Sequence, residues 1–131
     1  MENYYVEAQK DIYFVPGVSL DAGTGICTLT GSSYLSDTVK FYSPVMSWLI
    51  QYMTEIRGPL TFNFRLTYFN TSTGKSFIEI LMLLKQYERD GGEVAINWYV
   101  YDDEDLVEEI EDFGIQTDLK INIILVDEEN G

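Results

Sequence analysis

The chain has 131 residues, of which 46% are hydrophobic and 15% aromatic, the size and composition of one folded globular domain. Its formal net charge is −14, from 22 acidic and 8 basic residues, which disfavours nucleic acids and anionic membranes as partners. Histidine is absent and Cys27 is the only cysteine, which excludes His/Cys metal clusters, disulfides within the chain and catalytic centres that need histidine.

Membrane insertion and secretion are not indicated either. No apolar run approaches the roughly 20 residues that a membrane-spanning helix needs. The N-terminal segment MENYYVEAQKD lacks a basic stretch followed by an apolar one, so it does not predict a signal peptide. The sequence therefore indicates a soluble, reduced, cytoplasmic protein. Its acidity either serves solubility alone or suits basic protein surfaces, and the composition leaves both possibilities open.

The first part of the chain is expected to form short strands. Residues 4–8 and 11–20 are rich in β-branched and aromatic residues, and Pro16 makes the second stretch a short or bent edge strand. A turn signal at 21–25 precedes apolar–polar alternation at 26–30, and together these predict a hairpin. The cysteine in its second strand is interpreted as a small strand residue rather than a reactive thiol.

A helix follows a polar connection at residues 31–36. Apolar side chains recur at helical spacing over residues 45–56, with Trp48 expected in the core. Pro44 suits the first helical position, with Ser43 as the N-cap. A helix that begins at Asp37 and is kinked at the proline is the alternative. A Gly-Pro pair ends the helix.

Residues 60–89 read as a strand, a hydroxyl-rich turn and a long amphipathic helix. Alternation in the strand assigns one face to four residues, Phe62, Phe64, Leu66 and Tyr68. Apolar residues at 77, 80, 81, 84 and 87 share one helical face. The intervening NTSTGKS segment places four hydroxyls near the positive end of the helix dipole. Such a setting favours an anion or a covalently attached phosphate.

The C-terminal part alternates between helix and strand again. An Asp-Gly-Gly sequence ends the central helix. The expected elements after it are a strand at 94–100, a helix at 102–113 ended by Gly114, and a last strand at 119–126. The acidic residues 127–131 are expected to fray.

The order of these elements predicts the fold class. Strand and helix alternate as β-β-α-β-α-β-α-β, with room for one extra N-terminal strand. This order predicts an α/β fold in which residues 1–131 form one domain with about three helices. The sheet should be mixed and mostly parallel, with right-handed crossovers and an antiparallel N-terminal hairpin at its edge.

Two ligand-binding motifs are poorly matched. TSTGKS resembles the end of a phosphate-binding P-loop, but the first glycine of that motif would fall at Phe69, and residues 70–73 contain no glycine. The acidic run at 102–105 lacks the glycine and the spaced ligands of a calcium-binding EF-hand, and a solvated helix N-terminus explains it better. The sequence thus predicts no catalytic residue, no metal site and no cofactor.

The hydroxyl-rich turn has two explanations. One is capping alone, in which Asn70 or Thr71 caps the helix, or Ser76 and Glu79 form a capping box for a later start. The other is phosphorylation of one hydroxyl, which would add about −1.5 to −2 charge and three acceptor oxygens. Arg65 and Lys75 are possible counter-charges. These physical arguments leave both explanations open.

Several short motifs resemble one known family. They are LTYFNTS at 66–72, GSSY at 31–34, Val45-x-x-Trp48, the strand at 60–69, and the Trp98-Tyr99 pair within 94–101. Their order and spacing, over most of the chain, resemble the SiaC family of bacterial regulatory phosphoproteins.

The resemblance implies a fold like that of STAS domains and anti-sigma-factor antagonists, and a non-enzymatic role in partner switching. In the family, the threonine directly after the asparagine of the NTS motif is phosphorylated by a partner-switching kinase, and a PP2C-type phosphatase reverses this. The unphosphorylated form binds and activates a diguanylate cyclase in c-di-GMP signalling. By that match Thr71 is the phosphoacceptor, and Ser72 and Thr73 are secondary candidates.

The expected docking surface combines the turn with the exposed side of the following helix. Its candidate residues are Asn70, Thr71, Ser72, Thr73, Lys75, Ser76, Glu79 and Met82. Phosphate on Thr71 is expected to block the effector through charge and desolvation. The competing functions are a constitutive adaptor without a phospho-switch and a nucleotide-binding enzyme that uses the TSTGKS turn.

Overall fold

The computed structural model describes residues 1–9 and 14–126. The strands are β1 (Tyr4–Val6), β2 (Gly17–Leu20), β3 (Ile26–Ser33), β4 (Leu60–Phe69), β5 (Val94–Val100) and β6 (Asn122–Leu125). The helices are α1 (Thr38–Gln51), α2 (Thr71–Arg89) and α3 (Glu104–Thr117), and a π-helical turn, η1 (Tyr52–Ile56), continues α1. The acidic tail expected to fray, 127–131, lies outside the described residues.

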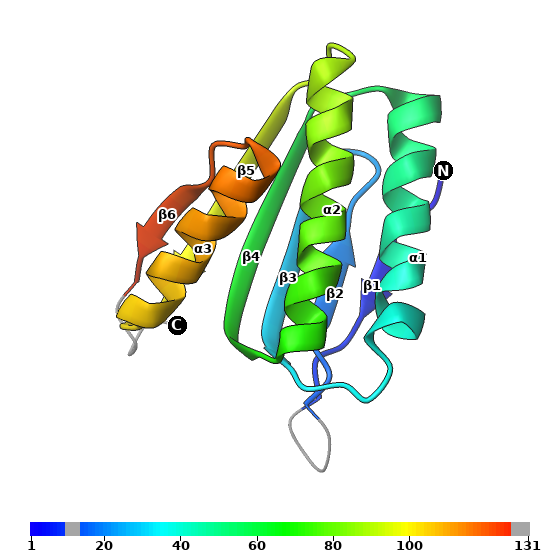
Figure 1. Cartoon of the computed structure of the whole chain (residues 1–131). Helices are drawn as coiled ribbons and strands as arrows, with labels where there is room; N and C mark the ends of the chain where they lie inside the picture. The colour runs from blue at the N-terminus through cyan, green and yellow to red at the C-terminus, as the bar shows by residue number, and fades with distance from the viewer. Residues whose placement is uncertain (10–13, 127–131) are drawn as a thin grey trace.

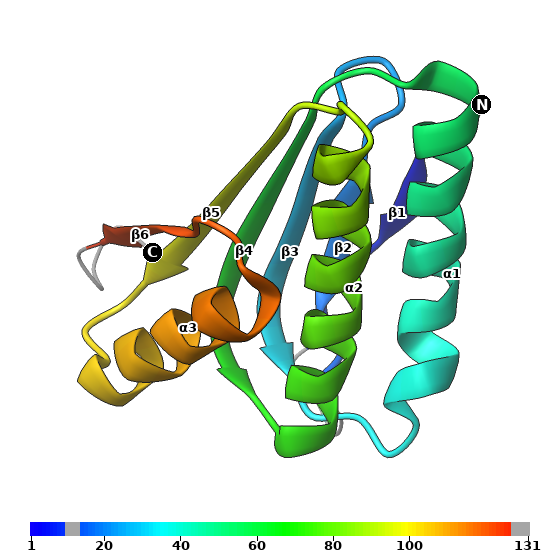
Figure 2. The same ribbon diagram turned by 45° about the horizontal axis from the view of Figure 1, so that its top comes forward.

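One sheet organises the domain, and its strand order follows the chain from β1 to β6. The pairs β1–β2 and β2–β3 are antiparallel, whereas β3, β4, β5 and β6 are parallel to one another. Right-handed crossovers that always advance in one direction place their helices on the same side. Figures 1 and 2 show α1, α2 and α3 together on one face of the sheet. The predicted fold class is confirmed, including the extra N-terminal strand.

The core fills the space between the helices and the covered face of the sheet. On β5, Ile96, Trp98 and Val100 are buried, as the alternation predicts. Trp98 stacks on Phe64 with ring centroids 4.1 Å apart, and Phe77 of α2 meets both rings edge-on. Burial of one such side chain stabilises the fold by about 1.5–3 kcal/mol. This aromatic cluster therefore fixes α2 against β4 and β5.

Helix α1 begins earlier than its proline suggests. It starts directly after Asp37, whose carboxylate accepts a hydrogen bond from the backbone N–H of Lys40 at 3.0 Å. The predicted start at Pro44 with Ser43 as N-cap is wrong, and the alternative start at Asp37 is confirmed. Burial of Tyr42 stabilises the turns that precede the proline and offsets the one helical hydrogen bond that proline cannot donate.

The other end of α1 is anchored by two aromatic side chains. Trp48 is buried, as predicted, and its indole N–H donates to the backbone oxygen of Glu2 at 2.9 Å. The hydroxyl of Tyr52 donates to the oxygen of Pro59 at 2.8 Å, beyond the end of η1. Arg57 adopts a left-handed conformation (φ 58°) that ends the helix.

A bulge in β4 changes the predicted facing of its last residues. Gly31 pairs with Leu66 but the next residue of β3 pairs with Tyr68, so Thr67 is the extra residue. Beyond this point the alternation is reversed. Tyr68 is exposed instead of sharing the buried face, and Phe69 turns toward the core, with its ring 5.0 Å from that of Phe77. The facing predicted for Tyr68 is therefore wrong.

Three predicted boundaries also differ from the structure. The polar connection predicted at 31–36 begins later in the structure, because β3 continues to Ser33 in register with β4. Helix α3 runs through Gly114 to Thr117. A Cβ on this glycine would lie 3.1 Å from the oxygen of Leu119, so the glycine serves the close approach of the following chain rather than the helix end. The last strand begins at Asn122 rather than 119.

The single cysteine lies on β3 and is fully buried. Burial, with a smaller contribution from Asp21, raises the pKa of the Cys27 thiol to about 12. The thiol is therefore protonated at neutral pH, which confirms its interpretation as a packing residue. Within the described part of the chain, no helix is long and apolar enough to cross a bilayer.

Candidate functional site

The hydroxyl-rich turn joins the end of β4 to the start of α2. Asn70 is the N-cap, and its side-chain oxygen accepts hydrogen bonds from the backbone N–H of Thr73 at 3.0 Å and from the Ser72 hydroxyl at 3.2 Å. Of the capping alternatives, the one that assigns Asn70 is confirmed. A capping box of Ser76 and Glu79 is wrong, because α2 is already formed at Thr71.

The turn is also held from the side of β3. The backbone N–H of Asn70 donates to the oxygen of Ser33 at 3.3 Å. Its side-chain amide donates to the oxygen of Leu35 at 3.4 Å. One asparagine thus satisfies the helix start and fixes the turn against the end of the neighbouring strand.

The four hydroxyls of the turn fall into two groups. Thr71 and Ser72 are exposed, whereas Thr73 and Ser76 are buried. The hydroxyl of Thr73 shares a hydrogen bond of 2.9 Å with Ser33, which also accepts one from the Tyr42 hydroxyl at 2.9 Å. This buried chain of hydroxyls ties α2 to β3 and α1. Only the first two hydroxyls face solvent.

Ser33 and Tyr42 are site residues that sequence reasoning missed. Burial raises the pKa of Tyr42, whereas its hydrogen bond to Ser33 lowers it by a smaller amount. The available signal was the polar GSSY segment immediately before a predicted helix, although nothing in the sequence links it to the turn 40 residues later.

The exposed candidates on α2 form one stripe. Thr71, Lys75, Glu79 and Met82 are all exposed, and their spacing of four, four and three residues places them on one side of the helix. Met82 is 54% exposed, although its side chain is apolar. Together with Asn70 and Ser72, these residues make up what we call the α2 stripe.

Positive and negative groups both lie near the start of α2. The positive end of the α2 dipole and Lys75, one turn after Thr71, favour a negative group, and the first turn of α2 has no acidic residue. Glu109 of α3 approaches from the other side, with one carboxylate oxygen 3.9 Å from where a Cβ on Gly74 would lie. Partial burial, followed by the charges of Asp103 and Asp112, raises the pKa of Glu109.

An exposed aromatic pair lies beside the turn, at the end of β3 and β4. Tyr34 and Tyr68 are 57% and 51% exposed, and their ring centroids are 6.0 Å apart. The sequence prediction missed this pair, because a regular strand would have turned Tyr68 inward. Exposed tyrosines are common in protein interfaces.

The structure places the residues of the two rejected motifs as follows. Phe69, at the first P-loop position, packs on the core aromatic rings instead of leaving room for a phosphate. Asp103, in the acidic run, caps α3 by accepting a hydrogen bond from the backbone N–H of Leu106 at 3.1 Å, which confirms its interpretation as part of a helix start. Among residues 1–9 and 14–126, no three acidic or cysteine side chains gather at a metal-binding distance.

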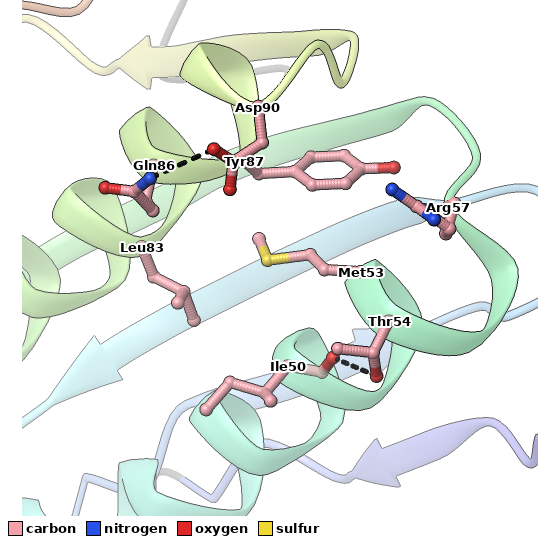
Figure 3. Close-up of a pocket in the computed structure, with 8 residues that line it drawn as sticks. All are labelled: Ile50, Met53, Thr54, Arg57, Leu83, Gln86, Tyr87 and Asp90. Atoms are coloured by element: carbon pink, nitrogen blue, oxygen red, sulfur yellow. Dashed lines mark hydrogen bonds between the residues drawn. The ribbon is translucent and has the colours of Figure 1, made fainter.

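A separate groove lies near the other end of α2 and is shown in Figure 3. Its volume is about 420 Å³, and its walls come from α1, η1 and α2. The lining residues are Ile50, Met53, Thr54, Arg57, Leu83, Gln86, Tyr87 and Asp90. The Tyr87 hydroxyl donates to the oxygen of Gly58 at 2.6 Å and closes one side. At about 1.5 Å per helical residue, Tyr87 lies roughly 24 Å along α2 from Thr71, so the groove is not part of the turn.

Comparison with known proteins gives matches over nearly all of the chain. A protein of Pseudomonas aeruginosa (strain UCBPP-PA14), described as uncharacterised, is 30% identical over 84 residues, which are 64% of this chain and 67% of that protein. The crystal structure of apo-SiaC from P. aeruginosa superposes with a TM-score of 0.85 at 25% identity, covering 95% of this chain and 99% of the other.

A third similarity is to a chain in the crystal structure of the diguanylate cyclase SiaD in complex with its activator SiaC, also from P. aeruginosa. The TM-score is 0.86 at 23% identity, over 94% of this chain and 99% of that chain, which shows a common fold. The sequence pattern of the SiaC family of regulatory phosphoproteins matches residues 6–126. This protein therefore belongs to the SiaC family of regulatory phosphoproteins.

Proposed function

We propose that this protein is a non-enzymatic phospho-switch whose phosphoacceptor is Thr71. A kinase of the partner-switching type adds the phosphate, a PP2C-like phosphatase removes it, and the unphosphorylated form binds an effector. Membership of a family of regulatory phosphoproteins supports the modification. The observation that carries the choice of residue is the exposure of Thr71 at the first position of α2, next to the capping Asn70.

Hydrogen bonding favours Thr71 over the other two candidates. Thr73 is fully buried and its hydroxyl is bonded to Ser33. Ser72 is exposed, but its hydroxyl donates to Asn70. Among the described residues, no hydrogen bond uses the Thr71 hydroxyl, so a kinase can reach it without opening the helix start.

The proposed effector is a diguanylate cyclase, and the output is c-di-GMP signalling. The support is the similarity to the chain solved in complex with the diguanylate cyclase SiaD. The proposed setting is the cytoplasm, where a kinase has access to ATP. The docking surface is the α2 stripe, with Asn70, Thr71, Ser72, Lys75, Glu79 and Met82 facing the partner.

The switch follows from charge at the start of a helix. A phosphate would add about −1.5 to −2 charge and three acceptors, within reach of the α2 dipole and one turn from Lys75. The folded protein therefore tolerates the phosphate. An effector that packs on the stripe would have to desolvate it and would be excluded.

Two experiments test this proposal. Intact mass measurement and phosphosite mapping of the natively expressed protein should place a single phosphate on Thr71. In binding measurements with the purified cyclase, Thr71→Ala should bind like the unphosphorylated protein, and Thr71→Asp should bind at least about tenfold more weakly. Ser47→Ala, at an exposed residue of α1 outside the α2 stripe, is the matched control and should leave both results unchanged. Equal affinity of the Ala and Asp variants for the cyclase would contradict the phospho-switch and favour a constitutive adaptor.

A further inference from the structure

The groove between α1, η1 and α2 has apolar side chains along its walls. Met53 and Leu83 extend toward each other across the space between the helices, as Figure 3 shows, and both are half-buried. Ile50 lines the same groove and is 49% exposed. The volume of about 420 Å³ is that of a small-molecule site. The groove is therefore large enough, and apolar enough, to hold an aliphatic group.

The polar side chains of the groove are already paired, with one exception. The Thr54 hydroxyl donates to a backbone oxygen one turn earlier at 2.9 Å, and the Gln86 amide donates to the Asp90 carboxylate at 3.2 Å. The Tyr87 hydroxyl donates to the backbone beyond η1 at 2.6 Å. Among the described residues, the guanidinium of Arg57 has neither an ion pair nor a hydrogen bond. Arg57 is thus the lining residue that is left to bind a ligand.

An uncommon backbone conformation places this arginine at one end of the groove. Its φ of 58° is left-handed, at a helix end where glycine is the usual residue. Non-glycine residues in this conformation cluster at ligand-binding sites. Arg57 directly follows the π-helical turn η1, and such turns are also frequent at functional sites. Figure 3 shows its side chain directed toward the hydroxyl end of Tyr87, at the edge of the groove.

The charge of Arg57 indicates the group that the groove can bind. The chain has 22 acidic and 8 basic residues, so an arginine without a partner among the described residues is available to an anion from outside. Of the eight lining residues only Asp90 is acidic, and its carboxylate is bonded to Gln86. The planar guanidinium fork matches a carboxylate through two parallel hydrogen bonds. With one arginine on a protein of net charge −14, a monoanion is favoured over a dianion.

We propose that this groove binds a small amphipathic carboxylate, which places its carboxylate on Arg57 and its aliphatic chain on Met53, Leu83 and Ile50. At about 30 Å³ for each water-sized group, the groove holds roughly 14 groups, so a linear carboxylate of about eight to ten carbons fits. The ligand is a free molecule, because the net charge disfavours contact with an anionic membrane.

Titration calorimetry of the whole chain with octanoate, octanol and acetate tests the chemistry of the ligand. Octanoate should bind with a Kd on the order of 1 mM, because it has few atoms and the groove is open to solvent. Octanol lacks the carboxylate and acetate lacks the chain, so each should bind at least about fivefold more weakly. Octanol that binds as tightly as octanoate would overturn the proposal, as would the absence of octanoate binding.

Substitution of the arginine tests its role. Arg57→Gln should weaken octanoate binding at least about fivefold. Arg57→Gly should do the same, and since glycine adopts the left-handed conformation readily, this variant separates loss of binding from loss of folding. Arg89→Gln, at an exposed arginine of α2 that does not line the groove, is the matched control and should bind octanoate like the wild type. Unchanged binding by both Arg57 variants would overturn the proposal.

A spectroscopic readout locates the ligand. In ¹⁵N–¹H spectra, octanoate should shift the side-chain amide of Gln86 and the backbone amide of Thr54, and it should leave the side-chain amide of Asn70 unchanged. Shifts that occur only outside the groove would overturn the proposal. Thr71→Ala should bind octanoate like the wild type, so the result is independent of the proposed phospho-switch.

Discussion

A single side chain, that of Asn70, determines how the hydroxyl turn is presented. Its side-chain oxygen accepts hydrogen bonds from the backbone N–H of Thr73 and from the Ser72 hydroxyl. Its side-chain amide donates a hydrogen bond to the backbone oxygen of Leu35. The result is that neighbouring residues have different environments, with Thr71 in solvent and Thr73 in the core. Accessibility at this turn is therefore decided residue by residue rather than by the turn as a whole.

Removal of the cap should destabilise the protein. Asn70→Ala leaves the backbone N–H of Thr73 without its acceptor, and a loss of about 1 kcal/mol in unfolding free energy is expected from urea denaturation. Asn70→Asp keeps a capping oxygen and adds a negative charge that the helix dipole favours. Its loss of unfolding free energy should therefore be much smaller. An alanine variant as stable as the wild type would contradict the role of the cap.

Valine substitutions should distinguish the two threonines. Thr73→Val removes the hydroxyl that Ser33 contacts and leaves a buried polar group with one partner fewer, at a cost of about 1–2 kcal/mol. The same change at Thr71, which is exposed, should stay within about 0.5 kcal/mol of the wild type. The measurement is chemical denaturation of both variants at one pH. Similar losses at both positions would show that the division of hydroxyls is wrong.

At the scale of elements, local signals predicted most of what positions the site. The alternation in residues 94–100 correctly predicted β5, and the capping residues before and within TSTGKS narrowed the start of α2 to a few alternatives, of which Asn70 is the one observed. The bulge at Thr67 depends on how β3 and β4 pair, and no local pattern reports it. The burial of Thr73 likewise requires Ser33, which lies 40 residues away.

Proline in α1 offers a test at this scale. Pro44 is exposed inside the helix, where its missing N–H leaves one helical carbonyl without a donor. Pro44→Ala should restore that bond and raise the unfolding free energy by at least about 1 kcal/mol. Ser43→Ala, at the adjacent exposed position, is the control and should change the unfolding free energy by only about 0.3–0.5 kcal/mol. A destabilised alanine variant would mean that the proline's rigidity in the unfolded chain dominates.

The contact between α3 and α2 should make stability depend on pH. The pKa of Glu109 is raised in the folded protein, so its ionised form opposes folding and its protonated form does not. Glu109→Gln should therefore stabilise the protein at neutral pH. The gain should shrink as the pH falls through the raised pKa toward the ordinary value of 4.5 and disappear below it. Thermal unfolding of both proteins across this range measures the effect, and a gain that grows at acidic pH would contradict it.

At the scale of the whole molecule, repulsion among carboxylates destabilises the folded state. Only two ion pairs are formed among the described residues, and both use Lys85, with Glu88 at 3.3 Å and Asp118 at 3.4 Å. Exposed pairs of this kind contribute little. The 8 basic residues leave a net charge of −14, which counterions in the solvent must balance.

Salt should accordingly stabilise the fold. Raising the ionic strength from about 10 mM to 0.5 M shortens the screening length severalfold and should increase the unfolding free energy by on the order of 1 kcal/mol. Denaturation in NaCl and in KCl should give the same increase if screening is the cause. A decrease would mean that attractive pairs outweigh the repulsion.

The order of the strands also bears on how this protein can fold during its synthesis. Each strand from β2 to β6 lies beside the one that precedes it in the chain, so a segment leaving the ribosome meets its neighbour already in place. The polypeptide can thus assemble progressively, one strand-and-helix unit after another, with β6 closing the structure last. The strand order therefore allows folding to follow the direction of synthesis.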